Sequence, residues 1–124
     1  MRALAKYHFG HLPAWVCGNA YFTGATVSRH ETHGLVDTEN EVTVELVEKG
    51  GKCVLKTNVY DLLKDFTDGV ITTDTLGCAF EPEERFENTD GTPITFDRDY
   101  LGAHRGLETL PGPFAEGGDE IVVW

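Results

Sequence analysis

The feature that most constrains the fold is residues 41–58, EVTVELVEKGGKCVLKTN. Val42, Val44 and Leu46 alternate with polar residues, which is the period of a half-buried strand. A second alternating run follows Gly50 and Gly51. Two alternating runs joined by a short glycine-containing link predict a β-hairpin. The Lys and Glu side chains of this hairpin indicate a scaffold with a solvated face and no catalytic group.

The length and the glycine content favour one β-rich domain. A chain of 124 residues can build one hydrophobic core but not two, so we predict a single domain over 1–124. Fourteen glycines favour a turn-rich chain over a helical bundle. We therefore predict an all-β, β-dominated fold, a jelly-roll-like β-sandwich with one short α-helix near 59–66. Asn58 can cap that helix, whose apolar residues share one face.

Other segments carry weaker patterns. Residues 19–24, 70–75 and 120–124 are rich in β-branched or aromatic side chains and predict strands. Residues 33–40 are polar and contain glycine, so they predict a loop. Residues 102–118 contain several glycines and two prolines and predict a long loop.

The charge of the chain limits its partners. Twenty-one acidic residues against ten basic ones give a formal net charge of -11. Nucleic-acid binding needs a clustered basic face, and docking on an anionic membrane needs the same, so we expect neither partner. No apolar segment is long enough to cross a bilayer. Neutral ligands, cations and complementary protein surfaces remain open.

Cysteine usage and the N-terminal segment predict a cytoplasmic protein. Cys17, Cys53 and Cys78 are odd in number and lack CxxC spacing, so they predict free thiols in a reducing compartment, each buried by default. The first fifteen residues have no continuous apolar core of a signal peptide. Cys17 follows His8 and His11, but Cys–His catalysis depends on geometry that spacing does not give.

Histidine spacing gives a weak metal hypothesis. His30, Glu31 and His33 resemble part of HExxH, but that motif needs histidines four apart on one helical face, and these are three apart. Only a turn could bring them together, and a plain polar loop is the competing interpretation. His8 and His11 have the same spacing and could join a histidine-rich pocket.

Aromatic and charged residues give binding candidates. Trp15 and Phe114 stand beside prolines in loop-like settings, where contact with a ligand or partner is more credible than burial. Tyr100 and Arg105 belong to a polar cluster around Asp97 and Asp99 that could hold a sugar. Two carboxylates two residues apart could instead be bridged by an arginine, so we predict no catalytic residue.

Three stretches carry a resemblance to a known family. They are GNAYF at 18–22, the hairpin VEKGGKCVLKTN and DGTPITFDRDYLG at 90–102. Together with the predicted architecture, they resemble the small β-sandwich domains that accompany carbohydrate-active enzymes, and in particular the β subunit of C-glycoside deglycosidases. The resemblance implies a larger TIM-barrel subunit that carries the divalent metal and the catalysis. It assigns no residue of this chain a role.

The function predicted from the sequence is a non-catalytic small subunit of a cytosolic heteromeric carbohydrate-active enzyme. Its aromatic loops would support the larger catalytic subunit, a small-molecule glycoside would be the ligand of the assembly, and no cofactor is expected on this chain. Two alternatives remain: a free-standing cupin-like metal-dependent enzyme, and a sugar-binding module.

Overall fold

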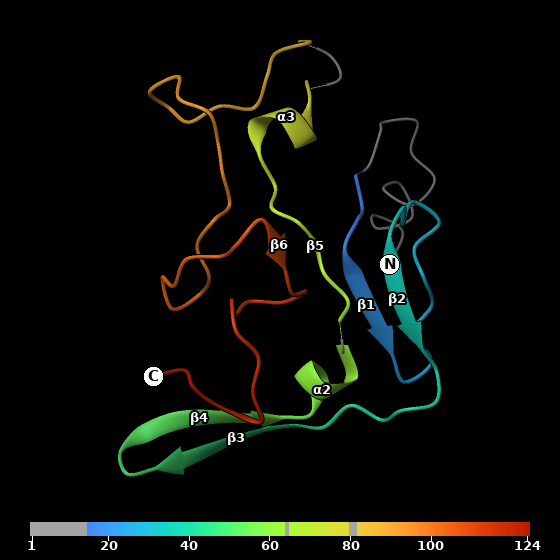
Figure 1. Ribbon diagram of the computed structural model, residues 1–124, viewed down its shortest axis with the longest axis vertical. Coiled ribbons are helices and arrows are strands. Elements are labelled where there is room, and N and C mark those ends of the chain that lie inside the picture. The colour runs from blue at the N-terminus through green and yellow to red at the C-terminus, as the bar shows by residue number, and fades with distance from the viewer. Residues whose placement is uncertain (1–14, 64, 80–81) are drawn as a thin grey trace, which may run out of the picture.

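The fold is a set of small sheets joined by long loops (Figure 1). The computed structural model describes residues 15–63, 65–79 and 82–124. Its elements follow in the order β1 (Asn19–Phe22), β2 (Gly34–Asp37), β3 (Val44–Lys49), β4 (Lys52–Thr57), α2 (Val59–Leu63), β5 (Asp68–Gly69), α3 (Thr73–Leu76), β6 (Glu108–Thr109) and β7 (Glu120–Val122).

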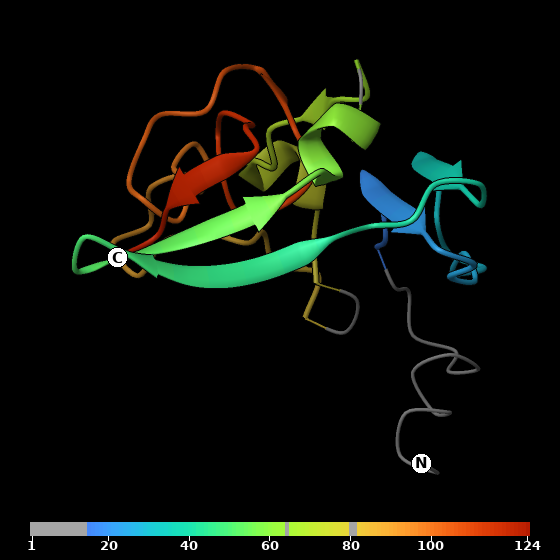
Figure 2. The ribbon, with the colours of Figure 1, turned by 90° about the horizontal axis from the view of Figure 1, so that it is seen from below.

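The predicted hairpin is confirmed and forms the longest ladder of the described residues. β3 and β4 pair antiparallel with Lys49 opposite Lys52, so Gly50 and Gly51 form a two-residue turn. Their φ angles of 62° and 75° are those of a type I′ turn, which glycine adopts without steric cost. β7 pairs with the other edge of β4, which confirms the predicted C-terminal strand (Figure 2).

A parallel pair of strands lies beyond the end of the hairpin sheet that is near α2 (Figure 1). β1 confirms the predicted strand near 19–24, and Asn19 pairs with Gly34 at its start. The prediction of a loop over 33–40 is wrong for β2, because Gly34–Asp37 forms four register pairs with β1. Local composition could not show this pairing, since each strand supplies the hydrogen-bond partners of the other.

Two short helices interrupt the strands. α2 confirms the predicted helix, but among the described residues it ends at Leu63 and not at 66. The strand predicted over 70–75 is wrong, because α3 begins at Thr73. The Thr72 hydroxyl accepts a hydrogen bond from the Thr75 backbone N–H, and the Thr75 hydroxyl accepts one from the Thr72 N–H. This capping box outweighs the β preference of the threonines.

The long loop near the C-terminus is ordered around one carboxylate. Oδ1 of Asp99 accepts the backbone N–H groups of Leu101 and Ala103 at 2.9 and 2.7 Å. Oδ2 accepts the N–H of Ala115 at 2.8 Å. The predicted loop over 102–118 is confirmed except for the two residues of β6, which pair with β5.

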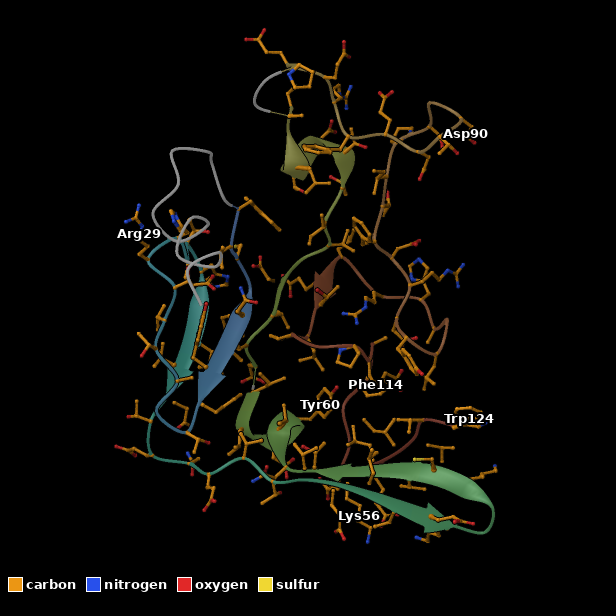
Figure 3. All side chains as sticks on the ribbon, turned by 180° about the vertical axis from the view of Figure 1, so that it is seen from behind. Arg29, Lys56, Tyr60, Asp90, Phe114 and Trp124 are labelled. Atoms are coloured by element: carbon orange, nitrogen blue, oxygen red, sulfur yellow. The ribbon has the colours of Figure 1, made fainter. Side chains whose placement is uncertain are left out.

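The buried hydrophobic side chains of the described residues are Val54, Leu63 and Phe114, so the core lies between β4, α2 and the C-terminal loop. Figure 3 shows Phe114 and Tyr60 in this region, with Trp124 at the outer edge. The strand content confirms a β-dominated fold, while the jelly-roll sandwich and the single domain stay predictions. Within the described ranges, no helix is long and apolar enough to cross a membrane.

Candidate functional site

A surface hollow of about 320 Å³ lies where the segment before β1, the β5 segment, residues 96–98 and the C-terminal loop meet. We call it the Trp15 hollow. Trp15 is 52% exposed, so its ring is available to a ligand. The side chains that give the hollow its chemical character are Trp15, Cys17, Asp68, Phe96, Arg98 and Arg105.

Backbone carbonyls hold the two arginines of the Trp15 hollow. Arg105 donates from Nη1 to the carbonyl of Leu110 at 3.2 Å and from Nη2 to that of Gly112 at 2.7 Å. Arg98 donates to the carbonyl of Gly102 at 3.3 Å. The hydrogen-bond acceptors are neutral carbonyls, so both guanidinium groups keep their positive charge, although the Asp99 carboxylate interacts electrostatically with Arg105. Both groups can attract a polar or anionic ligand.

Cys17, His33 and Asp68 form a side-chain group at one edge of this hollow, which we call the Cys17 cluster. The Cys17 thiol donates a hydrogen bond to Oδ2 of Asp68 at 3.0 Å. Nδ1 of His33 lies 3.5 Å from the same oxygen. The three donor atoms lie within 4.8 Å of one another. Cys17 and Asp68 also line the Trp15 hollow.

Several contacts fix the Cys17 cluster. Oδ1 of Asp68 accepts the Gly69 N–H at 2.7 Å, which leaves Oδ2 directed to Cys17 and His33. The carbonyl of His33 accepts the Gly18 N–H at 2.7 Å. The imidazole ring of His33 packs against the ring of Phe66, with the centroids 5.0 Å apart. A Cβ atom on Gly18 would lie 2.6 Å from Asp68 Oδ2, so this close approach requires glycine.

The charge state of the cluster follows from its hydrogen bonds. Donation to Asp68 favours the protonated thiol and, with burial, raises the pKa of Cys17 above its ordinary value. The same bond from Cys17, helped by the Gly69 N–H and by His33, lowers the pKa of Asp68. At neutral pH the group therefore holds a thiol against a carboxylate. A nucleophilic cysteine needs a lowered pKa, so this arrangement does not support thiolate catalysis.

The predicted grouping of His30, Glu31 and His33 is replaced by another one. His33 joins Cys17 and Asp68, whereas His30 accepts a hydrogen bond from Nε of Arg29 at 3.2 Å. Glu31 accepts hydrogen bonds from its neighbours: Asn19 Nδ2, the Tyr21 hydroxyl and the His33 N–H. Burial raises the pKa of Glu31, but these three hydrogen bonds outweigh it and lower the pKa overall. Glu31 thus positions the His33 backbone.

The other sequence candidates fall into four groups. Trp15 and Arg105 both line the Trp15 hollow, and their binding role stays a prediction. Tyr100 is 69% exposed, and its ring meets that of Phe114 edge-on at 6.0 Å. The expectation that Phe114 is exposed is wrong, because only 4% of it is accessible and it packs in the core. His8 and His11 lie outside the described residues.

The carboxylates of the predicted sugar cluster have separate structural partners. Oδ2 of Asp97 lies 3.3 Å from Nε2 of His104. Asp99 accepts three backbone N–H groups, of which the one from Ala115 contributes most to lowering its pKa. Both carboxylates therefore stabilise the loop, and the expectation that neither is catalytic stays a prediction.

The sequence interpretation missed Asp68 and assigned Cys17 to the core. Nothing in its sequence surroundings singled out Asp68, because 51 positions separate it from Cys17. The predicted free thiols are confirmed for all three cysteines, but Cys78 is exposed and the other two are half-buried. The one local indication of the site was glycine at position 18, directly after Cys17 and next to a strand. Glycine at such a position permits another part of the chain to approach the backbone closely.

Comparisons with known proteins place the fold. No protein-family model and no curated protein sequence matches the chain. A solved structure described as the complex structure of XylC with xylose matches the whole chain with a TM-score of 0.75 and 22% sequence identity. The match spans 22% of that protein, so the chain corresponds to about a fifth of its length. The likeness is one of fold.

Proposed function

We propose that the chain is a non-catalytic accessory subunit of a carbohydrate-active assembly and that the Trp15 hollow contacts the sugar. The observation that carries the proposal is this hollow, in which an exposed indole stands beside two arginines and a carboxylate. Sugar sites combine a flat apolar surface with a few placed polar groups, and the Trp15 hollow offers both.

The fold comparison also supports an association with carbohydrates. XylC was solved with xylose, and its likeness covers this chain completely while leaving most of XylC unmatched. A chain that matches only part of a larger protein solved with a sugar could work as one subunit bound to a second protein. The C-glycoside deglycosidase β subunit, a cytoplasmic location and a TIM-barrel partner that carries the divalent metal stay predictions within this proposal.

Exposed apolar side chains on the hairpin support a protein partner. Val44 and Leu46 on β3 are 66% and 65% exposed, although strand residues of this kind usually pack against a covering layer. They alternate along β3 and therefore share one face of the sheet. Apolar residues on a common face are typical of the centre of a protein interface.

Sugar binding is tested by calorimetry with xylose and short xylo-oligosaccharides. We expect Trp15→Ala to abolish the binding heat, because it removes the indole face assigned to the ligand. Trp124→Ala is the matched control: Trp124 is 91% exposed and does not line the hollow. Equal binding by both variants would contradict the assignment of the Trp15 hollow.

The subunit role is tested by co-expression with the product of the neighbouring gene, followed by size-exclusion chromatography. We expect a stable complex that Val44→Glu weakens, because a carboxylate would be buried in the interface. Sugar binding by the isolated chain with no complex would favour the alternative, a free-standing sugar-binding module. Metal-dependent turnover by the chain alone would favour the cupin-like enzyme.

A further inference from the structure

We propose that the Cys17 cluster is a zinc site in which Cys17, His33 and Asp68 are the protein ligands. The site would place a metal on this chain through a set of ligands that the sequence interpretation did not group together. It rests on the placement of one sulfur, one nitrogen and one oxygen donor from three separate segments within 4.8 Å.

The donor spacing is close to that of a tetrahedral zinc centre. Zinc ligand bonds of about 2.3 Å to sulfur and about 2.0–2.2 Å to nitrogen or oxygen put neighbouring donors roughly 3.3–3.7 Å apart. The His33–Asp68 distance of 3.5 Å already meets this spacing, and the Cys17–Asp68 distance of 3.0 Å needs a small separation. Rotation of the half-buried Asp68 side chain, which is 31% exposed, can provide it.

The chemistry of the donors selects the metal. A thiolate and an imidazole favour zinc and disfavour magnesium and calcium, which take oxygen ligands. Binding displaces the Cys17 proton into solvent, so the thiolate and the Asp68 carboxylate together balance the charge of Zn²⁺. The hydrogen bond that joins the thiol to the carboxylate is exchanged for two bonds to the metal.

Hydrogen bonds with neighbouring groups hold Asp68 and His33 in position before a metal binds. The Gly69 N–H holds one oxygen of Asp68, and Glu31 holds the His33 backbone at 3.2 Å. Outer contacts of this kind orient metal ligands. Three protein ligands leave a fourth position for water, which is the pattern of an open zinc site. Because Cys17 and Asp68 line the Trp15 hollow, a ligand in the hollow would be close to this metal.

The test is titration of the metal-free full chain with Zn²⁺ by calorimetry and with Co²⁺ by absorption spectroscopy. We expect one ion per chain and a thiolate-to-cobalt charge-transfer band. Cys17→Ser should remove the band and keep the fold, because serine can still donate to Asp68. His33→Ala and Asp68→Asn should weaken binding at least about tenfold.

Two substitutions serve as matched controls. Cys78→Ser removes an exposed thiol, and His30→Ala removes the histidine that the sequence pattern would have chosen. Both should bind Zn²⁺ like the unmodified chain, with folding checked by circular dichroism. The proposal is overturned if the chain shows no saturable binding, or if binding survives Cys17→Ser and His33→Ala and is therefore adventitious. Since no sugar is used, failure here leaves the proposed carbohydrate role untouched.

Discussion

At the scale of single residues, Gly18 determines whether the Cys17 cluster can form. Its φ of 73° lies in the left-handed region, and the carboxylate of Asp68 occupies the space where a side chain would begin. Two separate constraints therefore act on one position: a backbone conformation that favours glycine, and a steric contact with a site residue.

We expect Gly18→Ala to destabilise the chain by more than the roughly 1–2 kcal/mol that a left-handed conformation costs an L-residue. The matched control is Gly24→Ala, since Gly24 has a φ of 76° and a Cβ atom added there would have no neighbour within 4 Å. Urea denaturation measures the loss of unfolding free energy in both variants. The difference between the two losses is the cost of the contact with Asp68, because both positions have the same left-handed backbone conformation. Equal losses would show that Asp68 simply moves away.

The protonation of Cys17 predicts a dependence of stability on pH. Its pKa is raised in the folded chain, chiefly by the hydrogen bond to Asp68. The resulting stability is fully present below the unfolded pKa and is lost as pH rises through the folded one. In a chelating buffer, the free energy of unfolding should therefore fall on the alkaline side.

Cys17→Ser should remove this part of the alkaline loss, and Cys78→Ser should keep it. Tyr21 and Tyr60 also have raised pKa values, but both residues remain in the two variants, so the difference isolates Cys17. Denaturation curves at several pH values give the measurement. Parallel alkaline slopes for Cys17→Ser and the unmodified chain would rule out the thiol as the cause.

At the scale of elements, the loops depend on side chains that replace secondary structure. Asp99 accepts backbone N–H groups on both arms of the C-terminal loop. Arg105 ties the same loop through two carbonyls. Such contacts position the wall of the Trp15 hollow without a continuous strand.

Asp99→Ala should lower the melting temperature and loosen the loop, because three backbone N–H groups lose an ionised acceptor. The control is Asp97→Ala, which removes only an exposed pairing with His104 and should change stability little. The pKa of Asp99 is lowered, so its contribution is present above the unfolded pKa and is lost as pH falls through the folded one. Thermal melts from neutral to acidic pH check both expectations; a larger effect of Asp97→Ala would contradict them.

At the scale of the whole molecule, a small core holds several small sheets together. Phe114 is 4% exposed and connects the C-terminal loop to the region of α2. Leu63 is 1% exposed and comes from α2 itself. With so few buried hydrophobic side chains among the described residues, each of them affects the stability of the whole chain.

Phe114→Ala should cost about 3–5 kcal/mol, the usual range for truncating a buried phenylalanine. Natural domains are stable by only about 5–15 kcal/mol, so the variant should be close to unfolding at ordinary temperatures. Trp124→Ala should change stability by about 0.5 kcal/mol or less, because its side chain is 91% exposed. Similar denaturation midpoints for the two variants would show that Phe114 is not part of the core.

The sequence by itself determined the elements whose residues lie next to one another. Alternation and the Gly50-Gly51 pair predicted the hairpin, and a capping residue with apolar spacing predicted α2, because both depend on local backbone preferences. The β-dominated class followed from the glycine content of the chain. The sequence also supplied Trp15 and Arg105 as candidates from their residue type, and His33 from its spacing to His30.

Only the tertiary structure decided which side chains meet. β2 exists because β1 pairs with it, and Phe114 is buried because the loop around Asp99 directs it into the core. The Cys17 cluster joins residues from the segment before β1, the turn before β2 and the start of β5. Contacts between such distant positions depend on chain packing, which leaves no periodic pattern in the sequence, so the site became visible only in three dimensions.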